Sequence, residues 1–226
     1  MTSFVLVPGA GGQAWYWHRV VPLLEERGHT AVPVELPATD DTAGLAEYAD
    51  TIVAASPQGE VVVVAHSMGG LSAPLVVDRL DVREFVLVNA MTPGPGETGG
   101  EWWDAVGQEQ AAREFAHAQG RDPDAPFDVW DVFFHDVPPE ITAAAKAMPE
   151  PVQSDRPFAD PFPLAAWPDV PTRFLASRDD RLFPLKLQRR IVRERLGIEV
   201  EEIPGGHLVA LSEPVALVER LLDRAG

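Results

Sequence analysis

Serine, histidine and aspartate residues that could carry out nucleophilic catalysis occur in three separate stretches of the chain. The first is VVVVAHSMGG, residues 61–70, in which a β-branched run is followed by Ser67 among small neighbours. A serine that ends a strand and opens a helix lies on a sharp turn with its hydroxyl exposed, and only small neighbours let the strand and helix approach. The pattern here is A-x-S-x-G, with Ala65 in its first place. We predict Ser67 as a nucleophile, with an ordinary strand-to-helix turn as the alternative.

A nucleophilic serine needs a base to take its proton and a carboxylate to orient that base. His207 lies in the glycine-flanked stretch IPGGHLVALSEP, just after the last predicted strand, and is the predicted base. The chain order Ser, Asp, His places the carboxylate after an intervening strand, where SRDDRLFP offers Asp179 and Asp180. We predict Asp180, with Asp179 as the alternative. The other histidines are expected to be structural or solvated, and His66 is expected to pack away from the serine.

Acyl transfer also needs backbone N–H groups directed at the oxygen that becomes negative. Met68 follows the nucleophile at the start of the predicted helix, where the helix dipole favours an anion. The turn in VPGAGGQAWYW offers a second N–H at Gly9–Ala10. A phosphate-binding loop is the alternative for these glycines, but the order GAGG is not GxGxxG and no lysine follows. With no cysteine and no metal-ligand spacing among the histidines, neither a metal nor a cofactor is expected.

The elements that must position these residues alternate between short apolar runs and helix-like segments. This alternation is typical of an α/β protein with a mostly parallel sheet covered by helices. Pro33 cannot donate to a ladder, which indicates a less paired position for its strand. The predicted strands are Phe4–Val7, Thr30–Leu36, Val61–Ala65, Phe85–Asn89, Thr172–Ala176 and Ile198–Ile203. Helices are predicted over residues 19–28, 44–55, 185–197 and 213–225 and in the segment after Ser67.

Residues 91–169 depart from the alternation. They contain no convincing strand, are rich in proline, aspartate, alanine and aromatic residues, and offer helices near 102–118 and 140–148. A structureless loop of this length is uncommon in a compact domain, so we predict a small helical lid over 91–169 inserted in a core of 1–90 and 170–226. Aromatic side chains of the lid are predicted to line a substrate pocket or, alternatively, to form the lid's own core. They are Trp102, Trp103, Trp130 and Phe133.

Composition restricts the class of protein further. The 226 residues are 46% hydrophobic and 23% charged, which is typical of one soluble globular domain. A formal charge of −17 argues against nucleic acid or an anionic membrane as a partner. No apolar run approaches the roughly 20 residues of a membrane helix, and no cationic segment precedes the first apolar stretch. A cytoplasmic monomer or homodimer that acts on a small molecule is therefore expected.

Four motifs together resemble the α/β-hydrolase superfamily over nearly the whole chain. In order they are FVLVPGAGGQAWYWHRVVPLLEERGHTAVPVELPA, AHSMGG, SRDDRLFP and GGHLVALSEP, and the opening segment most resembles the branch of plant methylesterases, hydroxynitrile lyases and related bacterial esterases. The resemblance implies an α/β-hydrolase fold, with Ser67 as nucleophile, His207 as general base and Asp180 as its partner. It also implies an oxyanion hole formed by the amides of Ala10 and Met68. The family usually has a histidine before the first glycine, where this chain has Pro8.

Two substrate-binding positions separate esterases from lyases within this branch. Plant-type lyases resemble one another in having a threonine where this chain has Gly9 and a lysine where it has Leu208. A lyase needs that cation to meet departing cyanide, and leucine cannot supply it. We therefore expect hydrolysis of a small or medium carboxylic ester through an acyl-enzyme. A thioesterase, a ligand-binding sensor and a lyase on the same fold are the alternatives.

Overall fold

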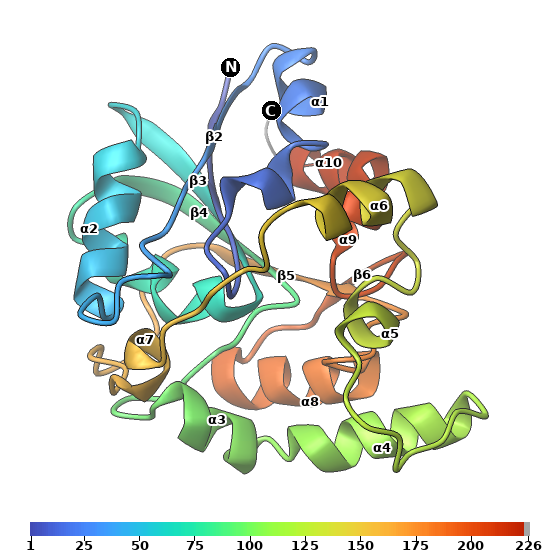
Figure 1. Cartoon of the computed structure of the whole chain (residues 1–226). Coiled ribbons are helices and arrows are strands. Elements are labelled where there is room, and N and C mark those ends of the chain that lie inside the picture. The colour runs from blue at the N-terminus through green and yellow to red at the C-terminus, as the bar shows by residue number, and fades with distance from the viewer. Residues whose placement is uncertain (224–226) are drawn as a thin grey trace.

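The structure is a computed structural model that describes residues 1–223. Its centre is a six-stranded sheet in the order β2-β1-β3-β4-β5-β6, and every neighbouring pair is parallel (Figure 1). The predicted α/β fold with about six mostly parallel strands is therefore confirmed. The strands are β1 Ser3–Val7, β2 Thr30–Pro33, β3 Glu60–His66, β4 Asp81–Val88, β5 Thr172–Ser177 and β6 Glu201–Ile203.

Each strand carries apolar side chains because both faces of the sheet are covered. Along β1, Val5 and Val7 pack into the core on one face, whereas Phe4 and Leu6 pack on the other. The first core contains residues of α2 Leu45–Ala55, α3 Gly99–Ala105 and α8 Leu185–Leu196. The second contains residues of η1 Ala14–Trp17, α1 Val21–Glu25, α9 Val209–Ser212 and α10 Pro214–Leu222.

Proline and glycine account for most of the differences from the predicted elements. β2 pairs only with β1, in agreement with the less paired position expected of a strand that contains Pro33, but it ends at Pro33 and not at Leu36 as predicted. Gly107, with a φ of +64°, separates α3 from α4 Gln108–Ala118, where one helix was predicted. α1 is shorter than predicted, with a proline in its first turn. The predicted end of α10, residues 224 and 225, lies outside the described residues.

The segment after Ser67 was predicted as a helix and forms two short 3₁₀ helices instead, η2 Ser67–Leu71 and η3 Ala73–Val76. Gly69 and Gly70 have low helix propensity, and Pro74 has no N–H for a continuous α-helical ladder. A single 3₁₀ turn has little of the macrodipole that a long helix has. The predicted contribution of a helix dipole at Met68 is therefore wrong, and only its N–H group remains as an argument.

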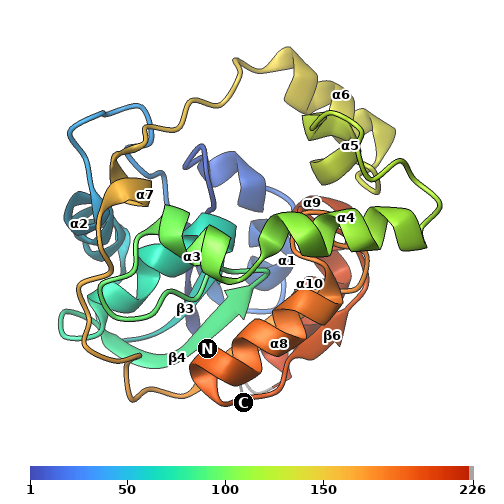
Figure 2. The ribbon, with the colours of Figure 1, turned by 90° about the horizontal axis from the view of Figure 1, so that it is seen from below.

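Between β4 and β5 lies a segment that we call the β4–β5 insertion, residues 89–171. Besides α3 and α4 it contains α5 Val129–Phe133, α6 Pro139–Ala147 and α7 Arg156–Ala159, and no strand was found in it. α4 lies beside α8 in Figures 1 and 2, whereas α5 and α6 lie together farther from the sheet in Figure 2. An extended stretch then crosses from α6 to α7 (Figure 2).

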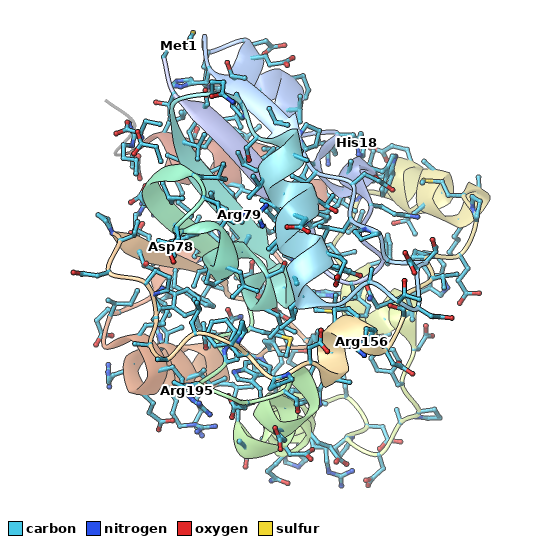
Figure 3. All side chains as sticks on the ribbon, turned by 90° about the vertical axis from the view of Figure 1, so that its left-hand side faces the viewer. Met1, His18, Asp78, Arg79, Arg156 and Arg195 are labelled. Carbon is cyan, nitrogen blue, oxygen red and sulfur yellow. The ribbon has the colours of Figure 1, made fainter. Side chains whose placement is uncertain are left out.

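Charged side chains fasten the insertion to the core. Arg195 of α8 donates to both carboxylate oxygens of Glu97, at 3.1 and 2.9 Å. Asp160, which pairs with Arg156, accepts a hydrogen bond from the Leu45 N–H at the start of α2, at 3.0 Å. Arg156 and Arg195 are labelled in Figure 3 on the side of the molecule where these contacts lie.

Within residues 1–223, no helix has both the length and the apolar character needed to cross a membrane.

Candidate active site

The turn that carries Ser67 is tightly packed from two sides. Ser67 has a φ of +51°, a conformation that non-glycine residues adopt at a cost and that is common at functional sites. A Cβ atom added at Gly69 would lie 2.7 Å from the Pro8 carbonyl oxygen, and one at Gly70 would lie 2.0 Å from that of Met91. Glycine is therefore required at both positions, because the chain after β1 and the chain after β4 press against the turn.

Ser67, His207 and Asp180, which are far apart in the sequence, are brought into one hydrogen-bonded chain. His207 Nε2 lies 2.9 Å from Ser67 Oγ, and His207 Nδ1 lies 2.8 Å from Asp180 Oδ2. Asp180 is fully buried and its Oδ1 accepts hydrogen bonds from two backbone N–H groups. An ionised carboxylate can only accept, so Nδ1 carries the proton of a neutral His207. Nε2 is then free to accept the proton of the Ser67 hydroxyl.

The turn that follows β5 directs the side chains of Asp179 and Asp180 to different sides. The Arg178 and Asp179 N–H groups donate to the carbonyls of Ile203 and Gly205, which continues the pairing of β5 with β6 past the end of the strand. The Asp179 side chain is exposed, whereas that of Asp180 turns inward to His207. Of the two carboxylates that the sequence offered, only Asp180 contacts the histidine.

Asn89, at the end of β4, holds the loop that carries His207, and sequence reasoning did not identify it. Its Nδ2 donates to Ser177 Oγ at 2.9 Å and to the His207 carbonyl at 3.2 Å, and its Oδ1 accepts from the Ser177 N–H at 2.8 Å. Its φ of +46° is one that asparagine tolerates better than most residues. An asparagine directly after an apolar strand is the signal that could have pointed to it.

His66 packs against His207, with ring centroids 4.8 Å apart. Its ring stacks on Tyr16 with centroids 4.3 Å apart, in agreement with the predicted packing role, and its Nε2 donates to the His207 carbonyl at 2.9 Å. Burial, together with the nearby His207, holds the pKa of His66 well below its usual value of 6.5. His66 therefore stays neutral at neutral pH and supports the loop without adding charge to the site.

The loop after β1 passes directly against Ser67. A Cβ atom at Gly9 would lie 2.8 Å from Ser67 Cβ, so the glycine permits this approach. Residues 9–12 form a turn in which the Gly12 N–H donates to the Gly9 carbonyl at 3.1 Å. Among residues 1–223, no protein acceptor was found for the N–H of Ala10 or of Met68. Both predicted oxyanion-hole donors are thus free to bind another group.

The predicted substrate-binding aromatic residues occupy three different environments. The Phe133 ring lies 5.3 Å from the His207 ring, and Leu208 follows His207 directly. Trp102 is only 1% exposed and packs in the core, whereas Trp130 is 39% exposed and lies under Lys146. The structure therefore brings Phe133 against His207, whereas no ring contact of Trp102 or Trp130 with His207 was found among the described residues, and Leu208 packs with the second core.

Two further aromatic residues complete the surroundings of His207. Phe183, which sequence reasoning missed although it follows Asp180 closely, lies 5.3 Å from the His207 ring in an edge-on arrangement. Trp103 and Trp102 both pack against Phe183, with centroids 5.3 and 5.4 Å apart, so each lies one ring away from the histidine; Trp102 is the more deeply buried of the two. In the part of the chain that the structure describes, no group of three or more potential ligands could hold a metal ion.

Fold and site together define the class of protein. Residues 4–220 match the profile of the Alpha/beta hydrolase family, and the chain belongs to this family. Methylesterase 3 of Arabidopsis thaliana is 28% identical over 254 residues, covering 98% of this chain and 95% of that protein. A pyrethroid hydrolase of Sphingobium wenxiniae is 26% identical over 252 residues, covering 100% of this chain and 88% of that protein.

A solved structure has the same fold over its whole length. The crystal structure of polyneuridine aldehyde esterase, an enzyme known from Rauvolfia serpentina, superposes with a TM-score of 0.79 at 23% identity and full coverage of both chains. The plant and bacterial relatives confirm the resemblance to the branch of plant methylesterases and related bacterial esterases.

Proposed function

We propose that this protein is a serine hydrolase that cleaves a small or medium carboxylic ester through an acyl-enzyme. The observation that carries the proposal is the hydrogen-bonded chain from Asp180 through His207 to Ser67, with distances of 2.8 and 2.9 Å. Such a chain supplies a nucleophile, a base and an orienting carboxylate. The relatives are named as esterases, which supports an ester as the substrate.

Acylation begins when Ser67 Oγ attacks the carbonyl carbon of the ester and His207 Nε2 takes the hydroxyl proton. The carbonyl oxygen becomes an oxyanion, which accepts hydrogen bonds from the Ala10 and Met68 N–H groups. The tetrahedral intermediate then collapses, the bond to the leaving oxygen breaks, and His207 gives its proton to the departing alcohol. Asp180 stays ionised and stabilises the imidazolium throughout.

Deacylation repeats these steps with water in place of Ser67. His207 Nε2 takes a proton from the water, whose oxygen attacks the acyl carbon and regenerates the oxyanion. The second intermediate releases the carboxylic acid, and Ser67 Oγ regains the proton from His207. The protein supplies every group that these steps need, so the reaction requires no further reagent than water.

In this proposal residues 91–169, which make up most of the β4–β5 insertion, form the lid, and residues 1–90 and 170–226 form the core. Ser67 is 8% exposed and His207 1%, so a substrate reaches them only past the side chains that cover them. Phe133 of the insertion and Phe183 of the core lie on His207, and both rings are apolar. We expect them, with Leu208 and Trp103, to contact the acyl or alcohol group.

Release of p-nitrophenol from esters with acetyl to dodecanoyl chains tests the proposal. The wild type should hydrolyse a part of this series, and Ser67→Ala should lower kcat/KM by at least about 10³-fold, because the nucleophile is lost. Ser72→Ala is a matched control, since Ser72 is also buried near the turn, and the one hydrogen bond found for its Oγ among residues 1–223 goes to the Gly69 carbonyl, at 3.5 Å. Full activity in Ser67→Ala would refute the proposal. Inactivity of both proteins would favour a thioesterase or a ligand-binding sensor.

A further inference from the structure

The turn of residues 9–12, which we call the oxyanion turn, has little intrinsic rigidity. Gly11 and Gly12 have φ values of +84° and +63°, and a glycine has no side chain that would restrict its backbone conformation. The Gly9 carbonyl accepts from the Gly12 N–H, and because the peptide group is planar and trans, the Ala10 N–H points the opposite way. The direction of the Ala10 N–H therefore depends on what holds this turn in place.

One side chain of the β4–β5 insertion binds the middle of the oxyanion turn. Gln153, in the extended stretch between α6 and α7, accepts a hydrogen bond at Oε1 from the Gly11 N–H, at 3.0 Å. A Cβ atom at Gly11 would lie 2.8 Å from Pro151 Cβ, so the same stretch also packs against the turn. The contact joins residues 142 positions apart, and it fixes the orientation of the Ala10–Gly11 peptide group.

Gln153 is itself held from the opposite side. Its Nε2 donates to Tyr48 Oη at 3.0 Å and to the Ser154 carbonyl at 2.9 Å. The Ser154 N–H donates to the Ala38 carbonyl at 2.7 Å, which anchors the stretch to the core. A glutamine with a bond at each end of its amide has a fixed orientation, so it can hold the turn rather than follow it.

We propose that Gln153 is a positioning residue that holds the oxyanion turn so that the Ala10 N–H stays directed at the reacting carbonyl. This rests on the proposed function, in which Ala10 supplies one oxyanion donor. Gln153 does not touch the substrate. It acts through the turn, and displacement of a donor by about 1 Å can lower the rate by as much as about 10²-fold.

Two substitutions of Gln153 test this inference. Gln153→Met keeps the length of the side chain but has no strong acceptor for the Gly11 N–H, and Gln153→Ala removes the side chain. The matched control is Ser154→Ala, because the buried Ser154 Oγ has no hydrogen-bond partner among the described residues. Three quantities are measured for each protein: kcat/KM on the preferred ester, the inhibition constant of a trifluoromethyl ketone with the same acyl chain, and the inhibition constant of the alcohol obtained by reducing that ketone.

Both Gln153 variants should lose about 10-fold in kcat/KM and, in parallel, about 10-fold in affinity for the trifluoromethyl ketone, whose adduct with Ser67 carries an oxyanion. The reduced alcohol, which is neutral and forms no oxyanion, should bind as it does to the wild type. Exchange of the backbone amide hydrogens of residues 9–12 in the folded protein, located by mass spectrometry of the peptide that contains them, should become faster in both variants. This readout does not depend on activity. Ser154→Ala should resemble the wild type in every measurement.

Unchanged ketone affinity or unchanged exchange of the oxyanion turn in Gln153→Met would overturn the inference. So would an equal loss of ketone and alcohol binding, because it would indicate a general distortion of the pocket. Failure of the proposed function itself would be seen separately, as hydrolysis that Ser67→Ala does not abolish.

Discussion

At the scale of the residue, the proton that moves in the proposed reaction is controlled by the two nitrogens of His207. Nδ1 donates to a fully buried carboxylate, and Nε2 faces the serine hydroxyl. Asp180 cannot rotate away, because its other oxygen accepts from the Leu182 and Phe183 N–H groups, both at 2.8 Å. The carboxylate thus determines which nitrogen is available to accept the serine proton.

The first prediction concerns Asp180→Asn. The amide oxygen can still accept from the two backbone N–H groups, which leaves the NH₂ group facing His207 Nδ1 and forces that nitrogen to accept. The imidazole proton then moves to Nε2, which can no longer take the proton of Ser67. We expect kcat to fall by about 10⁴-fold with little loss of stability, measured by p-nitrophenyl ester hydrolysis and thermal melting. Asp179→Asn is the matched control, and a larger loss there than at position 180 would show that the assignment is wrong.

The second prediction concerns pH. The pKa of His66 is held below its unfolded value of 6.5, so below that pH the unfolded chain binds a proton that the folded chain does not. The contribution of neutral His66 to stability should therefore be fully present above about pH 6.5. Below that pH the free energy of unfolding should fall, by up to about 1.4 kcal/mol per pH unit from this residue. His66→Gln keeps an N–H donor for the His207 carbonyl but does not titrate, so it should reduce this slope.

Urea denaturation at pH 7.5, 6.5 and 5.5 measures that slope. His117→Gln, which replaces an exposed histidine on α4, serves as the control and should leave the slope as it is in the wild type. Equal slopes for the wild type and His66→Gln would mean that His66 is not buried in its neutral form.

At the scale of the element, the site depends on how closely backbone segments approach the turn after β3. Gly70 lies against the chain that leaves β4, and the Met91 N–H donates to the Ser67 carbonyl at 3.0 Å. Neither segment can retreat without moving the nucleophile. The conformation of Ser67 is thus maintained by the ends of neighbouring strands.

The third prediction compares two glycines. Gly70→Ala would place its Cβ 2.0 Å from the Met91 carbonyl oxygen, a backbone atom that cannot rotate away. We expect a loss of about 3 kcal/mol in the free energy of unfolding and a fall in activity. Gly100→Ala, in α3, meets nothing within 4 Å and should gain about 0.5 kcal/mol. Urea denaturation measures both, and a Gly70→Ala protein as stable as the wild type would show that the turn is looser than described.

Local sequence signals predicted the strands well but not the contacts between distant segments. The β-branched run of β3 indicated a buried strand, and Pro33 indicated a less paired position, which β2 has at the edge of the sheet. Gly69, Gly70 and Pro74 were local signals against a continuous α-helix after Ser67, whereas the contact of this turn with the chain after β4 is not contained in a local pattern. Gln153 has no local signal at all, because its role depends on a turn 142 positions away in the sequence. Asn89 had a weak signal in its place at a strand end.

At the scale of the whole molecule, the parallel sheet explains why three distant stretches meet. Ser67 follows β3, Asp180 follows β5 and His207 follows β6, so all three leave the sheet at the carboxyl edge of its strands, where open α/β sheets bind ligands. Besides placing Phe133 against His207, the β4–β5 insertion reaches this edge through two hydrogen bonds. Gln153 binds the oxyanion turn, and Asp136 accepts a hydrogen bond from the Gly206 N–H beside His207, at 2.5 Å.

The central claim is that Ser67 carries the acyl group during turnover. Intact-protein mass spectrometry, after the enzyme is mixed with a p-nitrophenyl ester and quenched in acid within milliseconds to seconds, tests it most directly. We expect a species heavier by one acyl group, located on the peptide that contains Ser67, and a matching burst of p-nitrophenol; Ser67→Ala should show neither. Ester turnover with an acyl group on another residue, or undiminished turnover in Ser67→Ala, would contradict the account.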